Sequence, residues 1–405
     1  MMARRTAPRT PELQGLRGLA ALSTVVFHVW QQYFTYDASG THPPVASPAL
    51  GALFSLEVID LFFVLSAYLL TLAYARAAVD GDASRVRPRR IFLLRRAVRI
   101  LPVYVLAVLV VWASRNPTLP GDWRDLVEHL TFTHVFDRER IFYTLGPAWS
   151  LSLEVAFYLV LVALGPAAVR VCRRLPARRA RVALCAAGCG ALFLLPLGWI
   201  AYAHHVLDVP YTNWPVYFGP QARFGSFAAG MALAVAHVAL GGRGRAGARV
   251  AGPVALAALA GLYALSYASD PGNAASTYYH PLAALLWCAL LHVVLRPRAG
   301  ERPRWQGLLR ARWLTGVGLV SYSLYIWHEP VLLELSRRNL LPQGDAGFAA
   351  GVLLVTALAV GVAVACYWLV EYPAGLLARA RDARGEPREF YPEVKEQVPE
   401  PVGTR

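Results

Sequence analysis

The stretch Gln14–Tyr33 reads QGLRGLAALSTVVFHVWQQY and decides how the rest of the chain is interpreted. It is apolar over a length that can cross a membrane as a helix, yet it contains Arg17 and His28. Ionisable side chains at bilayer depth are costly, so they usually face a protein interior or a wet cavity. Eleven positions separate the two residues, so both lie on one helix face, roughly 16 Å apart along the axis. This face is expected to carry a fixed cation and a proton acceptor.

Each of the two residues also has a simpler interpretation. Arg17 could extend its side chain to the membrane interface, and His28 could be a packed hydrogen-bonding group without a chemical role. Their position on one helix face favours a functional interpretation of the pair over a structural one.

The composition is typical of a polytopic membrane protein. Of 405 residues, 56% are hydrophobic and only 16% are charged, and the mean hydropathy is +0.41. Ordinary soluble domains carry about 25% charged residues. The five cysteines fall in or beside apolar segments, and Cys185 and Cys189 have no further ligands at zinc spacing, so no metal site is expected.

Apolar runs of spanning length predict the architecture. Only helices or closed barrels can span lipid, and continuous runs of about 20 residues indicate helices. We therefore expect an all-α polytopic bundle of about ten transmembrane helices over residues 1–376, followed by a disordered cytoplasmic tail over 377–405. The predicted spans are 13–33, 52–74, 91–113, 148–169, 182–203, 223–240, 249–268, 280–296, 314–335 and 349–370.

The net charge of +15 follows a pattern along these spans. With ten helices, 32 of the 40 Lys and Arg residues fall on one side of the membrane and six on the other. Positive residues concentrate in cytoplasmic loops, so both termini are predicted to be cytoplasmic. This distribution explains the charge as topology rather than as nucleic-acid binding. The expected location is the cell inner (plasma) membrane, with the lipid bilayer as a partner and no obligate protein partner.

Further polar residues lie within the predicted spans, mostly at the depth of His28. Glu154 is a buried carboxylate that needs a partner, and Asp60 and Arg223 could instead form an ion pair that fixes packing. Ser150 could simply bond a neighbouring helix, and His328 could line a pocket. The polar residues expected in the outer half of the bundle are His28, Asp60, Glu154, Arg223 and His328.

Seven strings in order along residues 12 to about 376 resemble the membrane acyltransferase family 3, the multi-pass O-acyltransferases. The first contains the family's Arg-x10-His pattern, here at Arg17 and His28. The strings are ELQGLRGLAALSTVVFH, VIDLFFVLSAYLL, FLLRRAVRILPVY, AWSLSLEVAFYL, RFGSFAAGMALA, SYSLYIWHEP and YWLVEYP.

The resemblance implies a bacterial enzyme that transfers an acyl group, commonly acetyl, from acyl-CoA to a hydroxyl of a sugar, glycan, glycolipid or secondary metabolite. A hydroxyl attacking a thioester needs a base near neutral pH, and histidine is the usual choice. His28 is therefore the candidate general base or transient acyl carrier, with Glu154 or Asp60 orienting its ring. Arg17, Ser150, Arg223 and His328 are candidate substrate-binding residues.

The donor is polyanionic, so arginines near the cytoplasmic face could bind its phosphates. The candidates are Arg95, Arg96 and Arg99, although topology alone also explains them. A second class of function stays open, namely a proton-coupled secondary transporter or lipid flippase that uses the buried His, Asp and Glu residues. We find no inverted repeat or matching broken helices of the kind that transporters carry. The acceptor and the acyl chain length cannot be inferred from the sequence.

Overall fold

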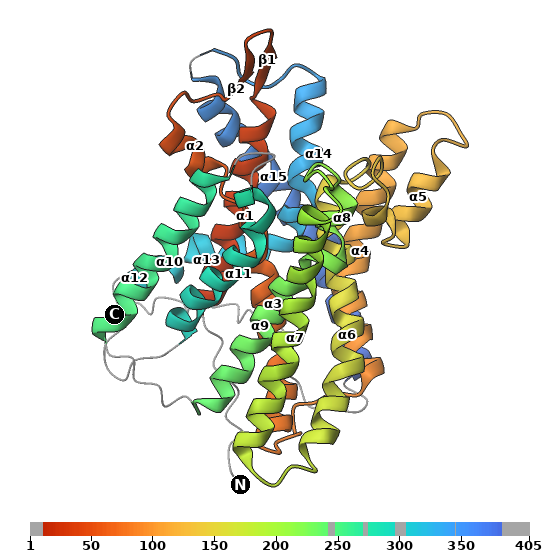
Figure 1. Cartoon of the computed structure of the whole chain (residues 1–405). Helices are drawn as coiled ribbons and strands as arrows, with labels where there is room; N and C mark the ends of the chain where they lie inside the picture. The colour runs from red at the N-terminus through yellow and green to blue at the C-terminus, as the bar shows by residue number, and fades with distance from the viewer. Residues whose placement is uncertain (1–10, 242–247, 270–273, 296–304, 345, 383–405) are drawn as a thin grey trace, which may run out of the picture.

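The protein is described by a computed structural model that covers residues 11–241, 248–269, 274–295, 305–344 and 346–382 (Figure 1). Within these ranges the regular structure is helical apart from one two-stranded hairpin, which confirms the all-α prediction. The elements are α1 (Pro11–Gln32), β1 (Thr35–Asp37), β2 (Gly40–His42), α2 (Pro48–Phe54), α3 (Ile59–Val79), α4 (Arg89–Arg115), α5 (Trp123–Leu130), η1 (His134–Phe136), η2 (Gly146–Ala148), α6 (Trp149–Cys172), α7 (Arg178–His205), α8 (Trp214–Phe218), α9 (Pro220–Ala239), α10 (Ala248–Ala268), α11 (Ala274–Leu295), α12 (Trp305–Leu309), α13 (Arg312–Leu319), α14 (Ser321–Arg337), α15 (Gly347–Cys366), the π-helical turn η3 (Tyr367–Glu371) and α16 (Tyr372–Asp382).

Eight segments of the described chain are helical, long and apolar enough to cross a membrane. The predicted spans at 13–33 and 314–335 are not among them. The first is the helix α1, which holds Arg17 and His28. The second is divided into α13 and α14, of 8 and 17 residues, by a break at Val320. The fold is thus a polytopic helical bundle, and the segments that depart most from membrane composition carry three of the candidate site residues.

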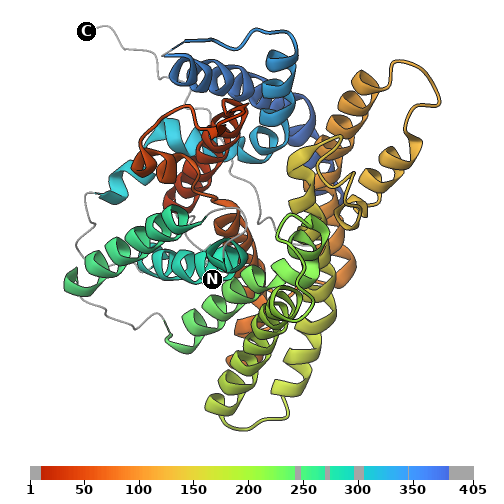
Figure 2. The same ribbon diagram turned by 45° about the horizontal axis from the view of Figure 1, so that its top comes forward.

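The first helix packs against the last ones. α1 contacts α13, α14 and α15, so elements from the two ends of the chain lie side by side (Figure 2). On the other side of the bundle α3 packs against α9 and α6, and α9 packs against α7. α10 and α11 pack on each other, and α11 also contacts α3 and α9. Residues 12–28 are thereby brought to the SYSLYIWHEP segment of α14.

Glycines allow α1 and the α12–α13 segment to approach closely. A Cβ placed on Gly15 would meet the carbonyl oxygen of Leu309 at 1.9 Å, and one on Gly18 would meet that of Leu314 at 2.3 Å. In return, a Cβ on Gly318 would meet the Gln14 carbonyl oxygen at 2.0 Å. Small residues of this kind let helix backbones pack tightly in membranes. The contact leaves α1 little freedom to slide along its neighbour.

The connection between α4 and α6 carries α5 and η1 and projects from one end of the bundle (Figure 1). Tyr104 on α4 donates a hydrogen bond to the carbonyl oxygen of His129 at 2.6 Å, and its ring stacks on Phe132 at 4.7 Å. These contacts fix the loop to α4. At the end of the chain, helix α16 continues to Asp382, so the predicted tail boundary at 377 falls inside it. Residues 383–405 lie outside the described chain.

Candidate active site

A cavity lies where α1, α3, α4, α6 and α14 meet. It encloses about 690 Å³ of empty volume, part of which is open to solvent. Three guanidinium groups and one carboxylate line it, so the charged lining has a net positive charge. We call it the arginine cavity. Its polar lining consists of Arg17, Arg96, Arg99, Glu154, Ser66, Ser150, Ser321, Tyr158, Tyr322 and Tyr325.

Arg17 reaches the arginine cavity from α1. Its Nε donates to the Ser321 hydroxyl at 3.4 Å, and this serine is the first residue of α14, directly after the break at Val320. The guanidinium also interacts electrostatically with the carboxylates of Glu154 and Glu371 and with the like charge of Arg99. Arg17 is therefore held by α14 while its charge faces the cavity.

Helix α6 supplies three polar residues at intervals of four, which places them in one row on the helix surface. The Tyr158 hydroxyl donates to Glu154 Oε2 at 2.6 Å. Ser150 donates to the Pro147 carbonyl oxygen at 2.9 Å and accepts from the Tyr325 hydroxyl at 2.9 Å. The carboxylate of Glu154 thus keeps acceptor capacity toward the cavity, because Tyr158 occupies one of its oxygens.

His28 and His328 face each other across α1 and α14. His28 Nδ1 lies 3.0 Å from His328 Nε2, and the ring centroids are 4.8 Å apart. His28 Nδ1 also lies 3.0 Å from the Thr24 carbonyl oxygen. His328 is buried, with 1% of its surface exposed, whereas His28 is only partly buried. Neither histidine belongs to the lining of the arginine cavity.

Tyr325 connects the histidine pair to the arginine cavity. Its hydroxyl lies in the cavity lining and bonds Ser150, while its backbone carbonyl oxygen lies 2.8 Å from His328 Nδ1. The Tyr325 and His328 rings also contact, with centroids 5.8 Å apart. The two parts of the candidate site are therefore neighbours, joined through one residue of α14.

Asp60 and Arg223 belong to a third cluster. Asp60 is fully buried and accepts hydrogen bonds from the Ser226 hydroxyl at 2.6 Å and from His280 Nδ1 at 2.7 Å. Arg223 stacks over the ring of Phe218, with its guanidinium carbon 4.0 Å from the centroid. Its charge interacts with Asp60, but among the described residues its guanidinium nitrogens make no hydrogen bond of ordinary geometry.

The structure therefore divides the sequence candidates into separate places. Five of them line the arginine cavity, namely Arg17, Arg96, Arg99, Ser150 and Glu154. Arg95 is not part of that lining, although it lies on the same helix. The side-chain partner of His28 is His328 rather than Glu154 or Asp60. Asp60 was expected to orient the ring of His28, but the two residues do not meet, because Asp60 is hydrogen-bonded to α9 and α11.

Several cavity and cluster residues were missed from the sequence. Tyr158, Tyr325 and His280 were not among the sequence candidates. Glu371 lies in the π-helical turn η3, is buried, and accepts from the Ser323 hydroxyl at 3.0 Å. Its place in the YWLVEYP string and the charge within an apolar run were the available signals. Single-turn π-helices often accompany functional sites.

The arrangement fits chemistry on an anionic or polarised substrate. Arginines bind phosphate and carboxylate groups through several N–H donors, and a histidine pair can accept a proton. Glu154 and the surrounding hydroxyls add acceptors and donors for a polar substrate. In the described part of the chain, no three His, Cys, Asp or Glu side chains come together as metal ligands.

Comparison with known proteins identifies the family. The family model described as an acyltransferase domain matches residues 10–369. Acyltransferase MdmB of Streptomyces mycarofaciens is 28% identical, over 94% of this chain and 95% of its own length. The putative membrane-bound transacylase BcsY of Komagataeibacter xylinus is 27% identical, over 90% of this chain and 82% of its own.

A third relative is the peptidoglycan O-acetyltransferase OatA of Listeria monocytogenes, 24% identical over 82% of this chain and 51% of its own length. No solved structure matches the chain. The family match extends over nearly all of the bundle and includes every candidate site residue. The chain is therefore a member of the acyltransferase family 3, a family of membrane enzymes that transfer acyl groups.

Proposed function

We propose that this protein is an O-acyltransferase of the bacterial plasma membrane that uses acyl-CoA as the donor. It moves an acyl group, commonly acetyl, to a hydroxyl of a sugar, glycan, glycolipid or secondary metabolite. The observation that supports this most is the arginine cavity, where three guanidinium groups and Glu154 lie beside a histidine pair. Relatives named for acyl transfer and for peptidoglycan O-acetylation support the same class of reaction.

The donor end of the reaction is assigned to the arginines. Acyl-CoA carries several phosphate charges, and guanidinium groups are suited to bind them. Arg96 and Arg99 line the cavity from α4, and Arg95 adds positive charge on the same helix. Arg17 is placed to polarise the thioester carbonyl and to stabilise the oxyanion that forms during attack.

The acceptor end is assigned to the histidine pair and its neighbours. His28 acts as the general base, or carries the acyl group transiently, and Glu154 and Ser150 bind the polar acceptor. The buried Asp60–Arg223 cluster lies apart from this site, and we assign it a supporting role in which it holds α3, α9 and α11 together. In this proposal both termini lie in the cytoplasm, the arginine-rich start of α4 meets the cytoplasmic donor pool, and His28 lies nearer the opposite face.

The test uses the full-length protein in lipid nanodiscs with radiolabelled acetyl-CoA and a candidate acceptor pool. We expect label transfer or thioester hydrolysis that falls about 10²- to 10⁴-fold in His28→Ala, since that range is typical of general acid–base catalysis. His237→Ala, a histidine on α9 that contacts Tyr68, is the matched control and is expected to keep its activity. Full activity of His28→Ala would contradict the assignment of the base. Acceptor uptake into proteoliposomes without a product of increased mass would favour a transporter instead.

A further inference from the structure

We propose that His328 is a positioning residue that selects the tautomer of His28, so that the Nε2 lone pair of His28 is presented to the substrate. The inference rests on the proposed function, because it gives His328 a task within the same reaction. It replaces the expectation that His328 binds the substrate itself.

The hydrogen bonds of His328 determine its own tautomer. Its Nδ1 lies 2.8 Å from the carbonyl oxygen of Tyr325 and 3.3 Å from that of Leu324. Carbonyl oxygens only accept hydrogen bonds, so the proton of the neutral ring resides on Nδ1. The Nε2 atom of His328 then carries a lone pair and can act only as an acceptor.

This acceptor determines the tautomer of His28 in turn. His28 Nδ1 lies 3.0 Å from His328 Nε2 and 3.0 Å from the carbonyl oxygen of Thr24. Both neighbours are acceptors, so His28 carries its proton on Nδ1 and its lone pair on Nε2. Within the described chain, no hydrogen-bond partner occupies His28 Nε2. The lone pair that is left without a hydrogen bond is therefore on His28, the histidine that is only partly buried.

The proton balance of the reaction follows from this arrangement. The acceptor O–H gives its proton to His28 Nε2 while its oxygen forms a bond to the thioester carbonyl carbon. The carbon–sulfur bond then breaks, and the proton on Nε2 passes to the leaving sulfur, which releases the free thiol of CoA. During the step His28 is an imidazolium, and its Nδ1–H donates a charge-assisted hydrogen bond to the His328 lone pair. His328 thus stabilises the charged form without touching the substrate.

The activity test compares two substitutions at one position. Gln at position 328 can place a carbonyl oxygen near the site of Nε2, whereas Leu has no acceptor. Outer hydrogen-bond partners of metal-bound histidines contribute roughly 10- to 100-fold to affinity or activity, and we expect His328→Leu to lower kcat by a factor of that order with little change in KM. His328→Gln is expected to recover most of the loss. Equal losses in the two variants, or a loss confined to KM, would overturn the proposal.

A spectroscopic test does not depend on turnover. Nitrogen-15 NMR of the protein with labelled histidine distinguishes protonated from unprotonated ring nitrogens, and the His28 signals are those that disappear in His28→Gln. We expect a protonated Nδ1 and an unprotonated Nε2 in the wild type, and a mixture of tautomers in His328→Leu. The opposite tautomer in the wild type would overturn the proposal. If the wild type transferred no acyl group, the proposed function would fail while this measurement still tested the tautomer.

Discussion

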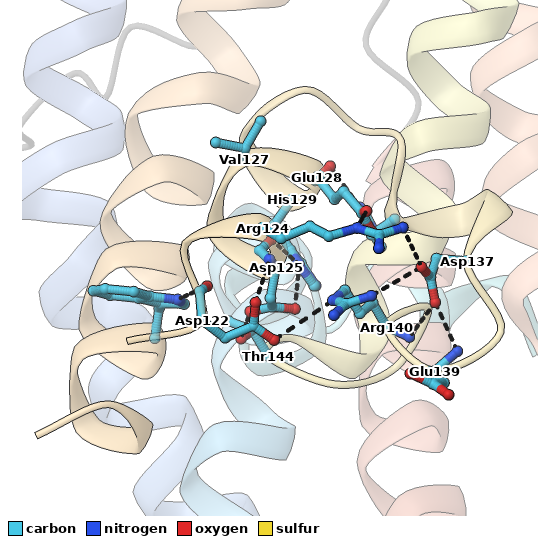
Figure 3. A network of polar contacts seen from close by, with 12 residues as sticks. Asp122, Arg124, Asp125, Val127, Glu128, His129, Asp137, Glu139, Arg140 and Thr144 are labelled. Atoms are coloured by element: carbon cyan, nitrogen blue, oxygen red, sulfur yellow. Dashed lines mark hydrogen bonds and ion pairs between the residues drawn. The ribbon is translucent and has the colours of Figure 1, made fainter. Parts of the chain in front are cut away.

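Two regions of the molecule are rich in polar side chains and differ in what those side chains face. In the loop around α5, the Asp125 carboxylate accepts a hydrogen bond from Thr144 and lies 3.1 Å from His129 Nδ1, and Asp137 is paired with Arg124 and Arg140 (Figure 3). These groups point at one another. In the arginine cavity the charged groups line a common space that is partly open to solvent.

This difference shows that a cluster of polar side chains does not by itself identify a functional site in this protein. A carboxylate or guanidinium that is paired with residues of its own loop helps to hold that loop. In the arginine cavity, three positive side chains instead line the same space. Their mutual repulsion raises the free energy of the site unless a ligand is bound. Substitutions in the two regions should therefore separate activity from stability.

Among the substitutions that compare the two regions, the largest effect is expected for Arg17→Gln. Removing a donor that stabilises a developing oxyanion lowers kcat by about 10²- to 10³-fold, and the cavity loses one of its three positive charges. Acyl transfer from labelled acetyl-CoA measures the effect. Arg312→Gln, which removes an exposed arginine at the start of α13, is the control and should leave transfer unchanged. Normal turnover of the Arg17→Gln enzyme would mean that the arginine cavity, like the loop, has only a structural role.

The second effect is expected for Asp125→Ala in the loop. The change leaves the Thr144 hydroxyl without its acceptor and removes the carboxylate beside the buried His129 ring, which destabilises the fold by about 1–3 kcal/mol. His129 Nδ1 keeps its hydrogen bond to the backbone carbonyl oxygen of residue 125. Denaturant unfolding in detergent micelles measures the loss. The variant that remains folded should retain its turnover number, and a selective loss of turnover would show that the loop takes part in the reaction.

The third effect is a loss of stability as the pH is lowered. Burial and the stacked ring of His129, 4.1 Å away, lower the pKa of His134 to about 3. Asp125 and the Glu128 and Ala148 carbonyls also face this ring. The unfolded chain takes up a proton near pH 6.5, so the folded state loses stability progressively as the pH falls from there toward 3. Unfolding midpoints measured across this range should fall, and His134→Phe should flatten the curve. A wild-type midpoint independent of pH would contradict the burial of a neutral His134.

The smallest effect is expected at the edge of the loop. Arg124 forms an exposed i,i+4 pair with Glu128 at 2.8 Å and also contacts Asp137. Exposed pairs of this kind contribute about 0.3–0.5 kcal/mol. Arg124→Ala should therefore shift the unfolding free energy by no more than that, and less at high salt. A loss comparable with that of Asp125→Ala would mean that the loop is held by its exposed ion pairs rather than by its buried core.

The sequence predicted the helical class, the family and the four charged residues that line the cavity. Arg17, Glu154 and Arg99 stand out because each places charge in an apolar run. Spacing along one helix also indicated that Arg17 and His28 share a face. It could not show that His28 meets His328, since that contact joins residues 300 positions apart and depends on how α1 packs on α14.

Two structural departures also have physical reasons. The break at Val320 divides a run that hydropathy presents as continuous, because apolar composition does not reveal where a helix changes direction. Asp60 was grouped with the base by depth alone, whereas its hydrogen bonds lead to Ser226 and His280 on other helices. Depth in the membrane places a residue along one axis and leaves its direction around the helix undetermined.

The glycine contact between α1 and α13 determines more than packing. Since a methyl group at Gly18 would meet the carbonyl oxygen of Leu314 at 2.3 Å, only one sliding register of the two helices brings their backbones this close. One helical turn is about 5.4 Å, so a shift by a single turn would carry His28 away from His328 and Arg17 away from Ser321 at once. The register that places both functional residues of α1 against α14 is thus set by glycines that themselves have no chemistry.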